Sequence, residues 1–241
     1  MSWYDRIKQR DQEIADRLAG SEAYFSLSPT RLSLSRVLLP RAKQYLRGTC
    51  LDAGAGRSAY APVLRACVQQ YIAMDIKPDA RLSLTGSVMD LPLRPASLDS
   101  LFCSQVLEHV PEPQRALHQF FNALKPGAYL VVSVPHLAYL HNEPHDYFRF
   151  TPHGLRHLCQ QASLDVVHLE PAGGLLAFLG HIPSIIVKAL TAGIPGLGGM
   201  VRSANRIYSR AVVWVDTRIE KRKLFALNYV LVARKPENAD A

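Results

Sequence analysis

The stretch that decides the fold spans residues 51 to 59 and reads Leu51-Asp52-Ala53-Gly54-Ala55-Gly56-Arg57-Ser58-Ala59. A short apolar strand, Cys50–Ala53, leads here into a loop of small residues. A loop without bulky side chains lets a ligand approach the backbone closely. By itself this GxGxxA pattern is a weak signal, since it also fits a dinucleotide site.

Acidic residues surround this loop. Asp52 immediately precedes the glycines, where a carboxylate would repel a pyrophosphate but would suit a cationic, phosphate-free ligand. Asp75 ends the next predicted strand, at a point where an acid can accept both hydroxyls of a ribose. Asp90 follows in the loop after the third predicted strand. Any one acid could be an ordinary turn residue, but their order along successive strand ends favours a nucleoside site.

Strand-like and helix-like segments alternate along the chain. The predicted strands are Cys50–Ala53, Gln70–Asp75, Leu82–Leu84, Leu98–Ser104, Ala128–Val134, Asp165–Glu170 and Leu227–Arg234, and the predicted helices are 3–19, Leu32–Leu46, Ala59–Ala66, Pro113–Leu124 and Pro152–Gln161. This alternation predicts an α/β fold with a doubly wound, mostly parallel, seven-stranded sheet. We expect one domain, with N-terminal helices over 1–47, a core over 48–170, an apolar helical insertion over 171–226 and a final strand over 227–235.

Residues 49–135 resemble the class I methyltransferases related to the ubiquinone- and menaquinone-pathway enzymes. The matching pieces are LDAGAG (51–56), the strand ending in Asp75, VMDLP (88–92), SLDSLFCSQVLEHVPEP (97–113) and LKPGAYLVVSVP (124–135). The C-terminal strand NYVLVARKP resembles the family more weakly. The resemblance implies a Rossmann-like methyltransferase fold, with S-adenosyl-L-methionine as the cofactor.

The same resemblance implies a role for each conspicuous residue of the site. Asp52 and the loop backbone would hold the methionine end, Asp75 the ribose, and Asp90 with the Leu91 backbone the adenine. Ser104 and Gln105 would face the sulfonium. The full set of implied cofactor-binding residues is Asp52, Ala53, Gly54, Ala55, Gly56, Asp75, Ile76, Asp90, Leu91, Ser104 and Gln105.

The chain departs from the family pattern in two places. Ser58 stands where the loop commonly has a third glycine. Some quinone O-methyltransferases hold a divalent metal with a Glu, Glu-His arrangement, and this chain has Gln105 ahead of Glu108 and His109. Because one carboxylate is missing and a hard cation prefers oxygen ligands, we expect no metal. We interpret His109 as closing the turn before Pro111.

The segment from His136 to Thr151 is dense in chemically active side chains. A hydroxyl acceptor usually needs a base, and histidine is the commonest one. We predict His145 as that base or as an orienting group, with Asp146 beside it as a second catalytic residue. His141 and Arg149 would contact the substrate, with Arg149 anchoring a carboxylate or phosphate. The alternative is that these side chains only brace the loop by hydrogen bonds.

The segment 175–201 carries one charged residue, Lys188, and is interrupted by Pro183 and Pro195. These breakers oppose a membrane-spanning helix, which needs about 20 unbroken apolar residues. Two interpretations stay open: a lid over the site, or a segment that docks on a membrane surface beside the following arginines. A hydrophobic or lipid-linked methyl acceptor would suit both.

Composition limits the partners and the compartment. The formal net charge is +8, but the basic residues are scattered, so we expect a solvated surface and no nucleic-acid partner. Four cysteines without a CxxC pair indicate a reducing compartment and no zinc site. The charged N-terminus lacks the apolar core of a secretory signal, so we expect a cytoplasmic protein, at most peripheral to the inner face of a membrane.

Three functions fit these observations. The first is S-adenosyl-L-methionine-dependent methyl transfer to a small-molecule acceptor that the sequence does not identify. The second is a nicotinamide-dependent oxidoreductase, against which Asp52 and the VMDLP loop argue. The third is a non-catalytic module that binds S-adenosyl-L-methionine and regulates a partner.

Overall fold

The computed structural model describes residues 3–191 and 197–238. The chain divides into two compact units. Unit 1 comprises Met1–Arg36 with Pro171–Leu227, and unit 2 comprises Val37–Glu170 with Asn228–Ala241. The predicted cofactor-binding core lies in unit 2, and the predicted apolar insertion lies in unit 1.

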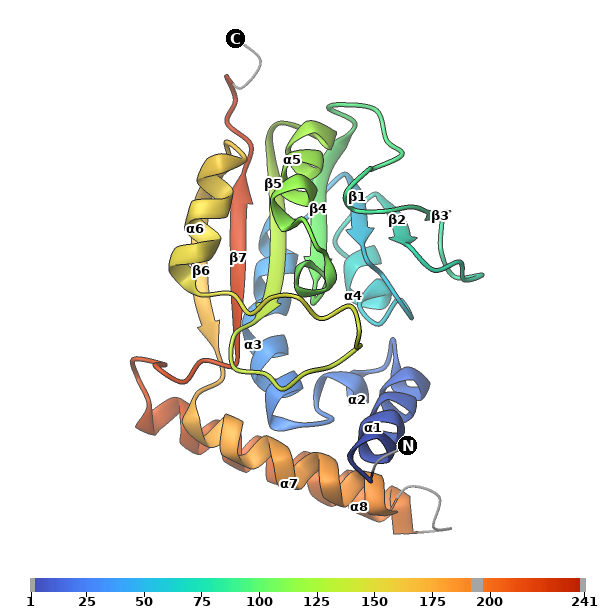
Figure 1. Ribbon diagram of the computed structural model, residues 1–241, viewed down its shortest axis with the longest axis vertical. Helices are drawn as coiled ribbons and strands as arrows, with labels where there is room; N and C mark the ends of the chain where they lie inside the picture. Colours follow the sequence, from blue (N-terminus) through green and yellow to red (C-terminus); the bar gives the residue numbers. More distant parts are fainter. Residues whose placement is uncertain (1–2, 192–196, 239–241) are drawn as a thin grey trace. The chain divides into compact units, whose positions relative to one another are not determined.

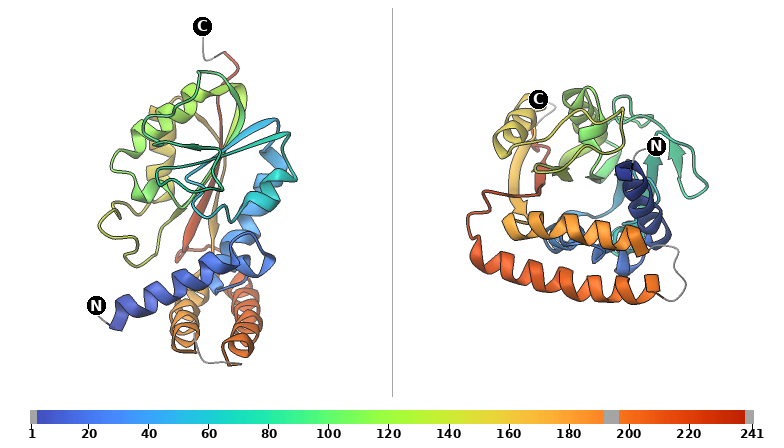
Figure 2. Two further views of the ribbon diagram at one scale, coloured as in Figure 1. Left: turned by 90° about the vertical axis from the view of Figure 1, so that its right-hand side faces the viewer. Right: turned by 60° about the horizontal axis from the view of Figure 1, so that its bottom comes forward.

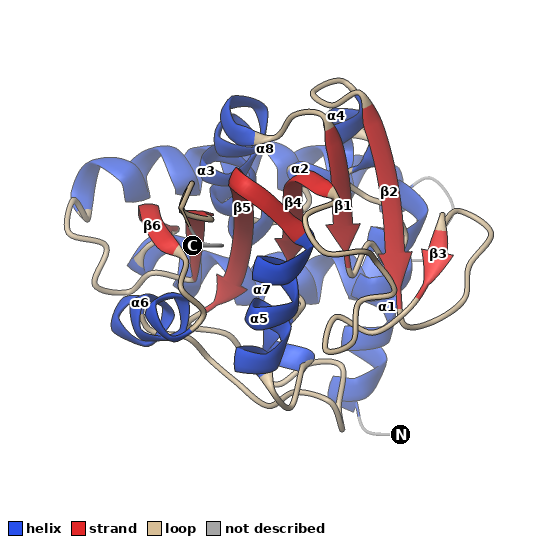
Figure 3. Cartoon of the chain, turned by 90° about the horizontal axis from the view of Figure 1, so that it is seen from above, coloured by secondary structure: helices blue, strands red, loops and turns tan. Residues whose placement is uncertain are grey.

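Unit 2 is built on a seven-stranded sheet (Figures 1 and 3). Its strands are β1 (Thr49–Ala53), β2 (Gln70–Asp75), β3 (Leu84–Thr85), β4 (Leu98–Ser104), β5 (Leu124–Pro135), β6 (Asp165–Ala172) and β7 (Asn228–Arg234). The order across the sheet is β3-β2-β1-β4-β5-β7-β6. The pairs from β3 to β5 are parallel, and β7 runs antiparallel to β5. The predicted mostly parallel, seven-stranded sheet is confirmed, and so is the doubly wound fold class.

Helices cover both faces of this sheet (Figure 3). On one face lie α5 (Pro113–Ala123) and α6 (Pro152–Gln161), and on the other lie α4 (Ala61–Arg65) and the end of α3 (Pro29–Tyr45). In α5 the apolar residues recur at helical spacing, so that Ala116, Leu117, Phe120 and Ala123 are all buried. At the start of α6 the side chain of Thr151 accepts a hydrogen bond from Gly154 N (3.0 Å), the cap that the Thr-Pro pair predicts.

Unit 1 is helical. It contains α1 (Trp3–Leu18), α2 (Glu22–Phe25), α7 (Leu175–Thr191) and α8 (Leu197–Ile219), together with the first turns of α3. Ile14, Ala15 and Leu27 form a small buried cluster in it. The predicted insertion is thus two helices, while Pro195, one of its predicted breakers, falls outside the described residues. Among the described helices, none has the combined length and apolar character needed to cross a membrane.

Several element boundaries differ from the sequence prediction. Strand β5 starts at Leu124, four residues early, because Leu124 pairs with Leu98 of β4, and Gly127 N donates further along to Lys235 O (2.9 Å). Helix α3 starts at Pro29, where Ser28 Oγ accepts a hydrogen bond from Arg31 N (3.4 Å) in the manner of a cap. The short third strand lies one to two residues later than predicted, and α2 was not predicted.

Candidate functional site

The glycine loop closes over the end of β2. Gly54 N and Ala55 N both donate to Met74 O at 2.8 Å. Gly54 has φ +79°, and a Cβ there would lie 2.3 Å from a Val106 methyl carbon, so only glycine fits. Gly56, with φ +51°, is different: a Cβ built there would meet no atom within 4 Å. The loop is therefore packed against β4's continuation at Gly54 and open at Gly56.

The three acids predicted for the cofactor stand in different environments. Asp75 accepts hydrogen bonds from Gly56 N (2.9 Å) and Lys77 N (3.1 Å), which ties it to the open part of the loop. Asp52 is buried and accepts a 2.6 Å hydrogen bond from the Tyr71 hydroxyl. Burial raises the pKa of Asp52 to about 7, although the Tyr71 bond opposes that rise. Asp90 is exposed, while the neighbouring Leu91 N donates to Gln119 Oε1 (3.2 Å).

The residues after β4 lie beside the glycine loop. Asp52 pairs with Phe102 in the sheet, and Gly54 meets Val106, so the ends of β1 and β4 are adjacent. Ser104 Oγ lies 2.8 Å from Ser133 Oγ, which also accepts from Gln105 Nε2 (3.3 Å). Every predicted cofactor-binding residue therefore lies at the carboxyl edge of the sheet or in the loops after β2 and β3, including Ile76, which is exposed.

The loop from His136 to Thr151 uses much of its polar chemistry internally. Arg149 Nη1 and Nη2 donate to the two carboxylate oxygens of Asp146 (2.6 and 2.8 Å), and Asp146 also accepts from His141 N (2.8 Å). Arg149 donates further to the carbonyl oxygens of Ala138, Tyr139 and Phe148. Burial alone would raise the pKa of Asp146, but Arg149 and the His141 N–H hold it at about 2. These contacts are the ones expected of bracing residues.

His145 lies at an exposed point of the same loop. Its Nδ1 is 3.2 Å from the Tyr147 hydroxyl, and its carbonyl oxygen accepts a 2.6 Å hydrogen bond from His109 Nδ1. The His109 side chain thus bonds the loop, while its backbone N donates to Val106 O (2.9 Å) and so closes its own turn, as predicted. His145 is held in this contact through its backbone.

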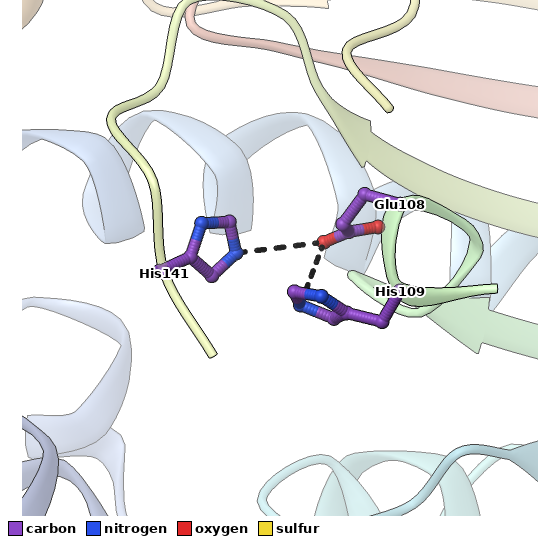
Figure 4. A group of neighbouring side chains, drawn as sticks. All are labelled: Glu108, His109 and His141. Carbon is purple, nitrogen blue, oxygen red and sulfur yellow. Dashed lines mark ion pairs between the residues drawn. The ribbon is translucent and has the colours of Figure 1, made fainter. Parts of the chain in front are cut away.

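A buried carboxyl, Glu108, faces two histidines (Figure 4). Its side chain is 0% exposed, and within the described residues neither carboxylate oxygen has a hydrogen-bond partner. Glu108 Oε1 lies 3.8 Å from His109 Nε2 and 3.9 Å from His141 Nε2. Burial, reinforced by the nearby Asp146, raises the pKa of Glu108 to about 8. Burial also lowers the pKa of both histidines, so their neutral forms are favoured.

This cluster has two chemical uses. Neutral imidazoles beside a carboxyl can accept and pass a proton. One donor atom from each of the three residues lies within 4.8 Å of the others, and imidazole with carboxylate is also a set that transition metals accept. The expectation of no metal stays a prediction.

The sequence analysis gave Glu108 and Ser133 no role in the site, and Tyr71 only a place in a strand. Glu108 is part of the run Val-Leu-Glu-His-Val, where a charged residue among buried apolar neighbours was the available signal. Tyr71 lies on β2 directly beside β1, but its bond to Asp52 depends on strand register, which the sequence does not show. Ser133 likewise meets Ser104 only through the pairing of β4 with β5.

Comparison with known proteins identifies the segment that carries this geometry. Residues 51–132 match a protein family described as a methyltransferase domain. The chain carries a methyltransferase domain. The match runs from the glycine loop through β5, so it includes the acids, Ser104, Gln105 and Glu108 of the methyltransferase domain, and it ends before the loop that contains His141.

One curated relative is a ubiquinone biosynthesis O-methyltransferase of Xanthomonas campestris pv. campestris. It is 34% identical over 125 residues, which cover 45% of this chain and 50% of the relative. The chain thus spans about half the length of the curated relatives it matches.

Solved structures share the fold. A SAM dependent methyltransferase from Archaeoglobus fulgidus superposes with a TM-score of 0.55 at 17% identity, covering 97% of this chain and 100% of that one. Phosphoethanolamine N-methyltransferase 2 of Haemonchus contortus, solved with S-adenosyl-L-methionine, gives a TM-score of 0.57 at 14% identity, covering 98% and 60%. At these identities the likeness establishes the fold of the methyltransferase domain.

Proposed function

We propose that this protein transfers a methyl group from S-adenosyl-L-methionine to a small-molecule acceptor at the carboxyl edge of the unit 2 sheet. The observation that carries the proposal is the open backbone at Gly56, bonded to Asp75, inside the segment that matches the methyltransferase domain family. Backbone space next to a ribose-binding acid is what a nucleoside cofactor requires.

The residues present fit this cofactor. Asp75 and Asp90, together with Asp52 in its ionised form, give the strand ends a negative character. That character suits a cationic, phosphate-free nucleoside and disfavours the pyrophosphate of a nicotinamide cofactor. Asp75 would hold the ribose, the open side of Gly56 would receive the methionine end, and Asp90 would reach the adenine. When bound, the cofactor supplies an already activated methyl group. What remains for the protein is to position the acceptor and to remove its proton.

The curated relatives support a quinone-related acceptor methylated at oxygen, because they carry the name ubiquinone biosynthesis O-methyltransferase. A phenolic hydroxyl of such an acceptor must lose a proton as the new bond forms. We assign that proton to His141 Nε2, since burial keeps this imidazole neutral and ready to accept it. Glu108 Oε1 lies 3.9 Å from this nitrogen, and its carboxylate form would stabilise the resulting imidazolium. The earlier prediction of His145 and Asp146 as catalytic residues stays a prediction that the same assay tests.

Titration calorimetry of the intact chain with S-adenosyl-L-methionine and with NADH tests the cofactor. We expect saturable binding of the first alone, and preferential binding of NADH would reject the proposal. Radiolabelled methyl transfer into fractionated cell extracts then identifies the acceptor. Tight cofactor binding with no labelled product in any extract would favour a non-catalytic binding module instead.

With an acceptor in hand, His141→Ala tests the assignment of the base. We expect kcat to fall by about 100-fold, with cofactor affinity unchanged, because general-base catalysis contributes on that order. Full turnover by His141→Ala, or the same loss in His145→Ala, would move the base elsewhere.

A further inference from the structure

The hairpin formed by α7 and α8 in unit 1 leaves a broad apolar surface uncovered. On α8 the exposed residues at helical spacing are Met200, Ala204, Ile207, Ala211 and Trp214. On α7 the exposed residues are Leu175, Leu179, Ile182, Val187 and Leu190. Met200 and Ile207 are each 70% exposed, Leu179 is 56% exposed and Trp214 54%. We call these two sets the outer face of the hairpin.

Both sets point in the same direction. The two helices meet where Gly180 packs on Tyr208 and Val212, with the Tyr208 hydroxyl bonded to Gly180 O (3.2 Å). A second side of each helix turns to the N-terminal segment, since Arg10 donates to Ala189 O (3.1 Å) and Asn205 donates to Leu27 O (2.7 Å). The remaining sides therefore both face away from that segment. Figure 2 shows the two helices side by side beneath α1.

The charge beside the outer face is positive. Residues 197–227 contain seven basic and two acidic side chains. The acids are occupied: Asp216 pairs with Lys223 (2.7 Å), and Glu220 accepts from Leu175 N and Phe225 N. Arg218, Lys221 and Arg222 are exposed at or just after the end of α8. Arg206 and Arg210 lie instead on the side of α8 that turns to the N-terminal segment, where they line a hollow with Glu22. Arg218 lies over the Trp214 ring, 3.6 Å from its centroid.

We propose that the outer face of the α7–α8 hairpin docks on an anionic lipid surface, with its apolar side chains in the acyl boundary and Arg218, Lys221 and Arg222 at the phosphates. An apolar face of this kind, with arginines and a tryptophan at its border, is the pattern of a helix that lies in the membrane interface. Anionic headgroups carry the negative charge that these basic side chains would pair with. The proposal does not depend on methyl transfer, but it would bring the site to a membrane-dissolved acceptor.

Cosedimentation of the full chain with vesicles tests the docking. The probes are phosphatidylcholine vesicles with and without about 30% phosphatidylglycerol, an anionic content that attracts basic surfaces. We expect binding to the anionic vesicles that weakens as salt is raised. With the chain's other tryptophan replaced (Trp3→Phe), the emission of Trp214 should shift to shorter wavelength on binding.

Two variants separate the apolar and the charged contributions. Ile207→Gln should weaken binding roughly tenfold, as expected for one buried aliphatic side chain. Lys221→Gln/Arg222→Gln should weaken it by about 30-fold, from about fivefold for each basic residue. Val167→Gln, and the two-charge pair Arg115→Gln/Arg156→Gln, remove exposed side chains of unit 2 and serve as matched controls that should bind normally.

Three outcomes would overturn the proposal. They are absence of binding by the unmodified chain, normal binding by the outer-face variants, and a dimer that these variants dissociate in the absence of lipid. Titration of the same samples with S-adenosyl-L-methionine keeps the two proposals apart. Absence of vesicle binding by the unmodified chain, with intact cofactor binding, rejects only the docking. Vesicle binding without cofactor binding rejects only the methyl transfer.

Discussion

Two polar regions contact the segment after β4, and they use their polar groups differently. The glycine loop meets Val106 at Gly54, yet leaves Gly56 and Asp75 accessible. The loop from His136 to Thr151 bonds Glu108 O through Tyr147 N and Phe148 N, and engages its own acid and arginine with each other. A polar residue that is conspicuous in the sequence is thus available for chemistry only when its neighbours leave it so. Glu108, less conspicuous, has the unbonded carboxyl.

The largest expected effect tests the bracing of the second loop. Asp146→Asn removes the charge that pairs with Arg149, and the Asp146 side chain is only 1% exposed. We expect the free energy of unfolding to fall by about 3 kcal/mol in urea denaturation, since the arginine is left without its anion. Asp90→Asn, at an exposed position, should change it by less than about 0.5 kcal/mol. Equal losses in the two variants would contradict the contrast between a paired, buried acid and an exposed one.

The pH dependence of this brace has a definite sign. The pKa of Asp146 lies below its ordinary value of 3.8, at about 2. Its contribution to stability is therefore present above pH 3.8 and is lost as the pH falls through about 2. Asp146→Asn should lack that acid transition.

The next effect tests whether Asp75, beside the glycine loop, binds the cofactor. Asp75→Asn keeps the shape of the side chain but weakens its bonds to a ribose, and we expect the affinity for S-adenosyl-L-methionine to fall by about 100-fold, roughly 2.7 kcal/mol. Calorimetry measures this loss directly. The matched control is Asp79→Asn, which removes the same charge four residues further along the chain. An unchanged affinity in Asp75→Asn would remove the ribose assignment.

A smaller effect of opposite sign is expected at Glu108. The pKa of this carboxyl is raised from 4.5 to about 8, so its contribution to stability is full below pH 4.5 and is lost as the pH rises through about 8. Glutamine cannot ionise, so Glu108→Gln avoids the cost of burying a carboxylate. We expect the free energy of unfolding to increase by roughly 1–2 kcal/mol near pH 8.5 and by less than half of that near pH 5. A destabilised variant at pH 8.5 would mean that Glu108 is ionised and paired.

The smallest expected effect is at the exposed end of the second loop. His145→Ala should change kcat by less than about threefold, because its ring contacts only the Tyr147 hydroxyl among the bonds observed in the described chain. Steady-state kinetics beside His141→Ala gives the ratio that decides between the two histidines. A larger loss in His145→Ala would restore the original prediction.

The sequence predicted the fold well because alternation of apolar strands and amphipathic helices is a local property. Strands β2 and β4 have the predicted bounds, and Thr151 caps α6 as expected. The early start of β5 was missed because it depends on the pairing of Leu124 with Leu98 of another strand, β4. Long-range pairing of this kind leaves no mark on the strand's own periodicity.

The candidate site was predictable to the same extent. The glycine loop and Asp75 were predicted from their spacing in the sequence, and the structure joins them by a hydrogen bond. The environment of Glu108 was not predictable, because the loop that contains His141 closes over it only in the folded chain. Whether a carboxyl is left without a hydrogen bond, as in Glu108, or is paired, as in Asp146, depends on packing, which spacing does not encode.

The first turn of α7 takes its hydrogen-bond acceptors from the far end of α8. Leu176 N and Ala177 N bond Asp216, Leu175 N bonds Glu220, and a Cβ at Gly174 would collide with both carboxylates. Hydrogen exchange of the amides at the start of α7 should therefore depend on local unfolding at the end of α8, about forty residues away. The two helices should open as one element. A chain from which the hairpin is deleted, or into which it is transplanted, should therefore fold only when α7 and α8 are removed or moved as a pair.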